Sequence, residues 1–379
     1  MPDATRLYPV TRTHLAALSD DVGIWQHAQG TQPDPRHGYC TDDVARALSV
    51  DVLHARELGW SAVGRSAWRS LSFLIAAFDP TSGRFRNVRA ANGQWEDETG
   101  SEDAHARALL ALAETLASDA EGRLRGVANT LFLRALPAAM ELRALRPRST
   151  AILALLAAAR AGQNDDLRFA QRRLGRALRT VMNGPAGRTG WPWPEPALTY
   201  ENALPARALI ELGAHEADRA TLERGLELFD WLARVQTHDG HLSPIGNRGW
   251  WPRGGPRARW DQQPIEAATL VLAAQAALEA TGEARYAAQM ELGYGWFLGA
   301  NDLGLAIASP QHGGCRDGLG PHGVNENEGA ESTLMWLLAL EAIRRLRRRT
   351  LTCRPSAPIA QMTHGTGRAR AREHVTQHV

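Results

Sequence analysis

The sequence contains no lysine, so all 43 basic residues among its 379 are arginines. Without lysine there is no Schiff-base nucleophile, no pyridoxal-phosphate anchor and no phosphate-binding loop ending in Gly-Lys-Ser/Thr. We therefore expect an activity that uses no cofactor.

Cysteine is scarce as well. The three residues at positions 40, 315 and 353 do not make a disulfide framework. Cys40, Cys315 and His322 would offer two thiols and an imidazole to zinc, but they lack the spacing of zinc motifs. We expect no metal site, and we predict that the loops carrying Cys40 and Cys315 meet through packing.

Long apolar runs are missing too. No stretch approaches the ~20 apolar residues that span a bilayer, and the N-terminal segment lacks the apolar core of a secretion signal. The net charge of +2 gives no electrostatic case for nucleic-acid binding. We expect a cytoplasmic protein that binds neither membranes nor nucleic acids.

What the sequence does contain is a repeated helix entrance. Acidic residues followed by arginine precede an alanine-rich segment in HGYCTDDVARALSV (37–50) and again in GSEDAHARALLALAETL (100–116). Related segments, apolar nearly all round as buried helices are, lie at 148–162, 198–213, 262–278 and 325–343. Equivalent positions are 46 to 65 residues apart, which fits one helical hairpin and a loop per repeat.

Amphipathic segments typical of surface helices alternate with these six, at 61–78, 124–145, 166–182, 221–235 and 284–299. A helix over 13–26 would supply a sixth. The pattern predicts an all-α fold, an (α/α)6 toroid in which a closed ring of six inner helices is surrounded by six outer ones, within a single domain over 1–350. An open solenoid is the alternative. Residues 351–379 have no apolar period and are typical of a flexible C-terminal tail.

Inner helices of such a ring begin at one end, where free N–H groups and helix dipoles favour negative charge. A single carboxylate there is most simply a helix cap, worth about 0.5–2 kcal/mol. The doublets Asp42–Asp43 and Glu102–Asp103 supply more acceptors than a cap needs. We predict that these four residues and Glu266 form an acid–base site.

Glycoside hydrolysis needs one protonated and one ionised carboxyl group. Neighbouring charge can raise the pKa of one member of a doublet, while Arg46 and Arg107, about one turn further along, would hold the other ionised. We expect an inverting reaction with Asp43, Glu102 and Asp103 as first choices, and Asp42 and Glu266 as orienting groups or substitutes.

Seven of the twelve tryptophans lie outside the predicted helices or at their margins. Loop tryptophans usually pack onto their own core, but flat apolar rings beside carboxylates also suit sugars. We predict a rigid platform at GWPWPEPALTY (190–200). The predicted substrate-binding residues are His37, Tyr39, Arg46, His105, Arg107, Trp191, Trp193, Glu201, Asn202, Trp260, Gln263, Asn327 and Glu331.

Together, HGYCTDDVARAL, GSEDAHARAL, DQQPIEAA, FLGANDLG and GGCRDGLGPHGVNENEGAESTL resemble a bacterial six-hairpin glycosidase-like family, found alone or attached to group-1 glycosyltransferases. The resemblance covers roughly residues 11–345. It implies an (α/α)6 toroid and a carbohydrate substrate. The chain departs from the family pattern at Glu328, where Gln is usual, and at Val44, where Asn is common.

Three functional hypotheses follow. The first is an inverting glycoside hydrolase acting on an oligosaccharide or glycoside. The second is a sugar epimerase or isomerase, which needs two bases facing one carbon and would draw on His27, His37 or His105. The third is a non-catalytic carbohydrate-binding partner of a glycosyltransferase, which would keep the tryptophans and tolerate neutralised acids.

Overall fold

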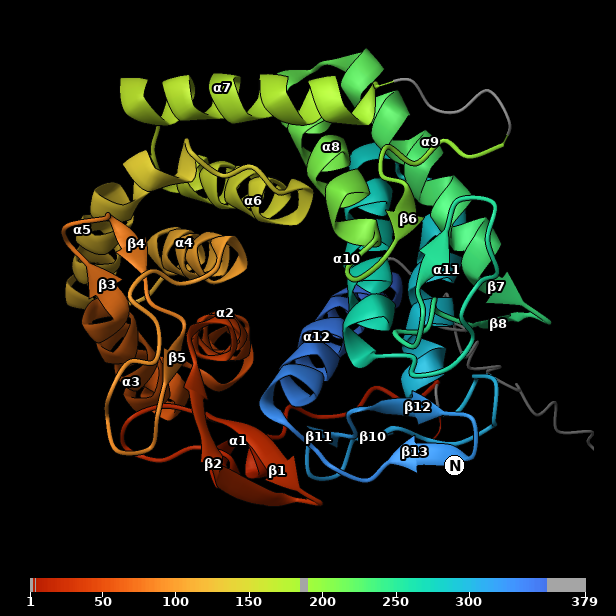
Figure 1. The fold of residues 1–379 in the computed structure, drawn as a ribbon, viewed down its shortest axis with the longest axis horizontal. Coiled ribbons are helices and arrows are strands. Elements are labelled where there is room, and N and C mark those ends of the chain that lie inside the picture. Colours follow the sequence, from red (N-terminus) through yellow and green to blue (C-terminus); the bar gives the residue numbers. More distant parts are fainter. Residues whose placement is uncertain (1–2, 4, 185–189, 353–379) are drawn as a thin grey trace, which may run out of the picture.

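A computed structural model describes residues 3, 5–184 and 190–352 of the chain. Six helices form its centre: α2 (Thr41–Leu58), α4 (Glu102–Leu116), α6 (Leu145–Ala161), α8 (Ala203–Glu216), α10 (Pro264–Thr281) and α12 (Ala330–Thr352). Each packs against the next, and α12 packs against α2, so the inner ring is closed (Figure 1). The predicted all-α toroid is confirmed.

Outer helices pack against the inner helices that precede them. They are α3 (Trp60–Ala77), α5 (Gly122–Ala139), α7 (Asp165–Met182), α9 (Arg219–Gln236) and α11 (Ala284–Phe297). All five fall on the predicted amphipathic segments. The inner helices are buried on most sides, as α10 shows: apolar and small residues are buried all around it. Alanine suits these positions because it lets neighbouring helix backbones approach closely.

The predicted helix over 13–26 is much shorter than expected. Only α1 (Thr13–Ala17) forms, and it packs against α12. The side chain of Asp20 accepts hydrogen bonds from the backbone N–H groups of Val22 and Gly23, at 2.8 and 2.9 Å. This local turn competes with helix continuation and directs the chain into a strand instead.

Short strands, which the sequence did not predict, lie in the loops between the helices. The longest belong to a three-stranded antiparallel sheet of β1 (Trp25–Gln29), β2 (Gln32–Cys40) and β5 (Val88–Arg89). β2 runs directly into α2 and so fixes where that helix begins. The other strands, each of two or three residues, are β3 (Phe78–Asp79), β4 (Arg84–Phe85), β6 (Ala197–Leu198), β7 (Thr237–His238), β8 (His241–Leu242), β9 (Trp251–Pro252), β10 (Ala308–Ser309), β11 (Gly314–Cys315), β12 (Gly318–Gly320) and β13 (Gly323–Asn325).

Two further expectations concern the C-terminal boundary of the domain and the absence of membrane-spanning helices. The last helix, α12, continues to Thr352, two residues past the predicted domain boundary, and the remainder of the predicted tail lies outside the described residues. Among the described helices, none has the length and apolar character needed to cross a membrane.

Close packing of α8 against α9 depends on glycine. A Cβ atom added at Gly213 would lie 2.4 Å from the backbone nitrogen of Leu222. We predict that Gly213→Ala lowers the free energy of unfolding by about 1–3 kcal/mol, because the two helices must separate to admit the methyl group. Urea unfolding monitored by circular dichroism measures the change.

Gly126→Ala is the matched control. Gly126 is also a helical glycine, but nothing lies within 4 Å of its added Cβ. This substitution should be neutral or stabilising by up to about 1 kcal/mol, because alanine is the better helix former. Equal effects of the two substitutions would contradict the packing argument.

Candidate active site

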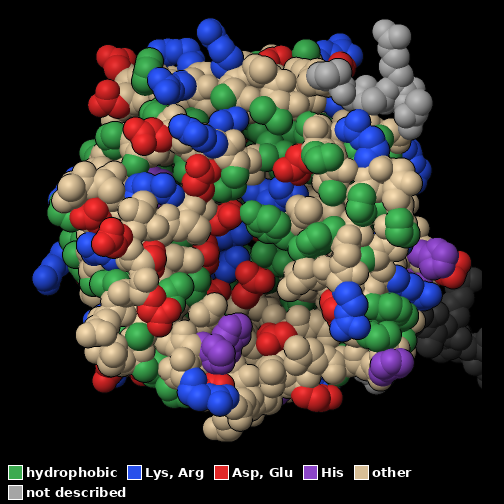
Figure 2. All heavy atoms as spheres, viewed as in Figure 1, with side chains coloured by type: hydrophobic (Ala, Val, Ile, Leu, Met, Phe, Trp, Pro, Cys, Tyr) green, Lys and Arg blue, Asp and Glu red, His purple; other side chains and the backbone are tan. Residues whose placement is uncertain are grey.

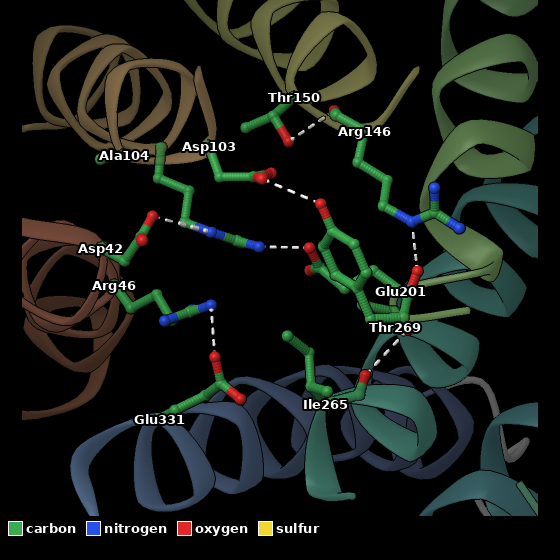
Figure 3. Close-up of polar contacts among 12 residues, drawn as sticks. Asp42, Arg46, Asp103, Ala104, Arg146, Thr150, Glu201, Ile265, Thr269 and Glu331 are labelled. Carbon is green, nitrogen blue, oxygen red and sulfur yellow. Dashed lines mark hydrogen bonds and ion pairs between the residues drawn. The ribbon is translucent and has the colours of Figure 1, made fainter. Parts of the chain in front are cut away.

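The beginnings of the inner helices meet around a recess at the centre of one face, which we call the central hollow. Figure 2 shows arginine and acidic side chains gathered there. Side chains that point into it come from α2, α4, α6, α12 and the turn before α8, and they include Asp42, Arg46, Asp103, Arg146, Glu201 and Glu331 (Figure 3). The predicted convergence of acidic helix starts is therefore present.

Arg46 joins the two helices at which the ring closes. Its guanidinium donates to Asp43 on its own helix at 2.8 Å and to Glu331 on α12 at 2.9 Å. Arg46 and Asp43 are buried, whereas the Glu331 side chain is 42% exposed. The pair with Glu331 therefore lies at the open side of the hollow.

Arg107 of α4 connects three parts of the ring. Its Nε atom lies 3.3 Å from Oδ1 of Asp42 on α2, and its Nη2 atom donates to Glu201 at the start of α8. Both carboxylates raise the pKa of the guanidinium, which stays charged. Asp42 and Glu201 are thus each held as partners of a fixed cation.

Arg146 of α6 completes the series, although sequence analysis missed it. It lies 3.0 Å from both carboxylate oxygens of Glu195 and donates to the backbone carbonyl of Tyr200 and to Oδ1 of Asn202. Its guanidinium also lies 4.6 Å from the centre of the Tyr200 ring. An arginine near the start of three successive inner helices was the signal that could have identified it.

The turn before α8 has a strained backbone. Glu201 has a φ of 47°, which non-glycine residues rarely adopt. Glu266 of α10 holds the turn in place: its carboxylate accepts from the backbone N–H of Glu201 and from the side-chain amide of Asn202, the latter at 3.1 Å. Glu266 therefore positions Glu201, and through it Arg107.

Asp103 has a different environment from the other acids. Its carboxylate accepts a hydrogen bond from the Tyr200 hydroxyl at 2.9 Å. Burial raises the pKa of Asp103, although Arg107 and the Tyr200 hydroxyl oppose the shift; Glu201 and Asp42 add to it. This carboxyl group is half-buried and is biased toward holding a proton.

Two fully buried acids are biased in the same direction. Burial raises the pKa of Asp43 to about 7, against the opposing effect of Arg46, and nearby Glu331 and Asp42 raise it further. Burial likewise raises the pKa of Glu266 to about 7, with the backbone N–H of Glu201 opposing. Asp42 pairs with Arg107 of the neighbouring inner helix.

Other predicted site residues serve the scaffold. The Glu102 carboxylate accepts from the backbone N–H groups of Arg143 and Ala144, at 3.0 and 2.8 Å, just before α6, and lines a separate cavity of about 320 Å³. His105 is fully buried beside Phe85, with ring centres 5.6 Å apart. Burial lowers the pKa of His105 to about 3, so it is a neutral core histidine.

Predicted ligands on the β1–β2 hairpin do not join the network either. Tyr39 is buried, stacks on Trp25 and donates to Asp20 at 2.5 Å. His37 is exposed on the hairpin, 4.7 Å from the His27 ring and 3.7 Å from the Asp34 carboxylate.

The predicted tryptophan platform is wrong. Trp191 and Trp193 are buried: Trp191 packs edge-on against Trp231 and Trp251, and the indole of Trp193 donates to Glu195 at 3.2 Å. The large apolar surface of the two indole rings favours their burial in the core over exposure in the hollow. The stretch that carries them instead holds Glu195 in place. Trp260 is half-buried, with Arg259 over its ring.

The remaining predicted residues lie in loops. Gln263 is half-buried directly before α10, and Asn327 accepts a hydrogen bond from the backbone N–H of Gly30 at 3.0 Å. Cys40 contacts Asp42 and Asn87, whereas Cys315 contacts the carbonyl of Arg316. Burial raises the pKa of both thiols, which disfavours a thiolate nucleophile.

Comparisons with known proteins identify the fold. No protein-family model matches the chain, and no curated protein matches its sequence. Solved structures do match in shape. Cellobiose 2-epimerase from Spirochaeta thermophila has a TM-score of 0.68 at 16% identity, over 89% of this chain and 93% of the epimerase. A D-mannose isomerase has a TM-score of 0.67 at 14% identity, over 88% and 94%.

A third match is an inactive variant of an α-1,6-mannanase from Salegentibacter sp. in complex with α-1,6-mannotetrose. It has a TM-score of 0.60 at 11% identity, over 88% of this chain and 96% of the mannanase. Two consecutive aspartates are replaced by alanine in that variant. The chain therefore has the fold of these enzymes, while membership of the six-hairpin family suggested by its motifs stays a prediction.

The raised pKa of Asp43 predicts a pH dependence of stability. The folded carboxyl binds its proton more tightly than the unfolded one, whose pKa is about 4. Its contribution is therefore fully present below pH ~4 and is lost as the pH rises to about 7. We predict that Asp43→Asn, which keeps an oxygen for Arg46, reduces this decline in the free energy of unfolding.

Urea unfolding of both proteins at intervals between pH 4 and 8 provides the measurement. Asp166→Asn, at an exposed acid in the first turn of outer helix α7, is the control and should keep the wild-type slope. An unchanged slope in Asp43→Asn would show that Asp43 does not titrate in this range.

Proposed function

We propose that the protein is a carbohydrate-active enzyme, specifically an inverting glycoside hydrolase with its active site in the central hollow. One observation carries the proposal. Neighbouring inner helices present two carboxyl groups in different surroundings: burial raises the pKa of Asp103 and biases it toward the protonated form, and Asp42 is ion-paired with Arg107. Such a pair is what acid–base hydrolysis of a glycosidic bond requires.

In the proposed reaction, Asp103 donates its proton to the leaving glycosidic oxygen. Asp42 accepts a proton from a water molecule as that water attacks the anomeric carbon from the opposite face. The leaving group departs as an alcohol and the sugar as a hemiacetal of inverted configuration. Arg107 keeps Asp42 in place and, through Glu201, is itself held by the turn that Glu266 supports.

Arg46 and Glu331 are the proposed substrate-binding groups. The partly exposed Glu331 carboxylate can accept hydrogen bonds from sugar hydroxyls while Arg46 fixes its orientation. Asp43 holds Arg46 from the buried side. This arrangement assigns the two members of the Asp42–Asp43 doublet to different tasks.

One of the structures reported above is consistent with hydrolysis. The mannanase variant is inactive with two consecutive aspartates replaced. In this chain three Asp-Asp pairs occur, at 20–21, 42–43 and 165–166, and among them the second begins an inner helix. A doublet at the hollow is consistent with the hydrolytic reaction.

We predict that Asp103→Asn and Asp42→Asn each lower kcat by about 10²–10⁴-fold, since each removes one proton-transfer group. Release of reducing ends from a panel of α- and β-linked oligosaccharides measures the rate. Proton NMR of the first product identifies its anomer. Asp166→Asn, in the equivalent doublet of an outer helix, should retain full activity.

Full activity in Asp103→Asn would contradict the proposed acid. Retention of configuration would contradict the proposed mechanism. Binding of an oligosaccharide with no turnover by the wild-type protein would instead support a non-catalytic role.

Tyr200→Phe is predicted to move the pH profile. The Tyr200 hydroxyl stabilises ionised Asp103, so its removal raises the pKa of the acid further. The alkaline limb of the kcat profile should shift to higher pH by a fraction of a unit or more. Tyr286→Phe removes a tyrosine hydroxyl on outer helix α11, where it accepts from Arg285, and should leave the profile unchanged.

An epimerase or isomerase is the second candidate, because two of the structures reported above catalyse such reactions by their names. It would need two bases facing one carbon. His27 and His37 are neighbours on one hairpin, and His105 is buried, so none of the three faces another across the hollow. Incorporation of deuterium from solvent into a sugar without bond cleavage would favour this candidate over hydrolysis.

A further inference from the structure

A cluster of metal-binding residue types lies at the seam of the ring, where the N-terminal segment meets the segment that enters α12. It consists of His14 on α1, His312 in the turn between β10 and β11, and Glu328 just before α12. We call these three residues the seam cluster. They are separate from the ion-pair network of the central hollow.

The three side chains already converge. Nε2 of His14 lies 3.7 Å from the Glu328 carboxylate, and Nδ1 of His312 lies 4.0 Å from the same oxygen. One ligand atom from each residue lies within 4.8 Å of the others. The backbone also joins the segments, because the N–H of His14 donates to the carbonyl of His312 at 2.9 Å.

One oxygen of the Glu328 carboxylate lacks a hydrogen-bond donor. Its side chain is only 8% exposed, yet its Oε2 atom has no hydrogen-bond partner. Oε2 lies over Gly314, where an added Cβ would come within 2.0 Å of it. A buried carboxylate oxygen without a partner is costly, and here it lies within reach of two imidazoles.

We propose that the seam cluster binds a divalent transition-metal ion, with Zn²⁺ as the best fit. Two imidazole nitrogens and one carboxylate oxygen are a donor set that zinc accepts, while Mg²⁺ and Ca²⁺ prefer oxygen ligands alone. The site is independent of the proposed function.

Binding requires a modest contraction. Ligand atoms about a tetrahedral zinc ion, each ~2.0–2.2 Å from it, lie roughly 3.3 Å apart. His312 is well placed to move, since its side chain is 40% exposed in a turn. Nε2 of His14 donates to the carbonyl oxygen of Glu328, 2.9 Å away. To bind the ion through Nε2, the neutral imidazole gives up this hydrogen bond and carries its proton on Nδ1 instead.

The ion would act as a clamp between distant parts of the chain. His14 and Glu328 are 314 residues apart in the sequence. The inner helices that follow them along the chain, α2 and α12, pack against each other and close the ring. An ion that binds only the folded form stabilises it by mass action. Bound zinc would therefore stabilise the contact between the N-terminal segment and the segment that enters α12.

Full-length protein, treated with EDTA and then freed of it, tests the proposal. Titration with ZnCl2 by calorimetry, with metal analysis after gel filtration, should show a site whose affinity falls at least tenfold in Glu328→Gln and in His312→Ala. ZnCl2 should raise the Tm of the wild-type protein by a few degrees, and MgCl2 should not. His322→Ala, at an exposed histidine of the neighbouring β12–β13 turn, is the control and should bind zinc as the wild type does.

Equal zinc affinity and equal zinc-dependent Tm in the wild type and both variants would overturn the proposal, as would the absence of zinc binding by the wild type. Either result would mean that the seam cluster is held by histidine–carboxylate pairing alone. His312→Ala guards against misfolding, because its half-exposed side chain contributes little to the core. Circular dichroism of the metal-free variants confirms that each is folded.

Discussion

Three arginines organise the centre of the ring by sharing carboxylates from different inner helices. Arg46 joins α2 to α12, Arg107 joins α4 to α2 and to the start of α8, and Arg146 joins α6 to the loop before α8. Removal of one partner from a buried ion pair leaves an uncompensated charge, which is strongly destabilising. Each carboxylate in the network is therefore also a constraint on how the helices are arranged.

Carboxylates outnumber guanidiniums in this network, and the surplus explains the acid–base properties of the hollow. Asp42 and Glu201 share Arg107 as an ion-pair partner, whereas Asp103 accepts a hydrogen bond from an uncharged phenol, that of Tyr200. Burial and neighbouring negative charge then raise its pKa. A fold that must neutralise three cations, and carries more acids than that requires, thus places neighbouring carboxyl groups in different electrostatic surroundings.

The sequence predicted the helices because their apolar periodicity is strong, and it predicted the meeting of the acids because inner helices share a direction. It could not predict which way each acid turns. Glu102 and Asp103 are adjacent, but successive residues on a helix point about 100° apart. Glu102 therefore accepts from the backbone just before α6, whereas Asp103 faces the hollow. Arg146 and Tyr200 act together only because a turn 54 residues away folds back, with Glu201 in a rare backbone conformation. The tryptophans show a similar limit: their positions in loops are visible in the sequence, but their burial depends on packing.

Closure of the inner ring also completes the central hollow. The pair between Arg46 and Glu331 crosses the junction of α2 with α12, so part of the hollow exists only when the ends of the ring meet. Glu328, three residues before Glu331, turns instead toward His14 and His312. The segment entering α12 therefore carries one carboxylate for the hollow and one for the seam. A ligand that stabilises the seam fixes the start of α12, and with it the position of Glu331, without touching the residues proposed to transfer protons. Through this single short segment, the stability of the junction is linked to the shape of the central hollow, where substrate binding is proposed.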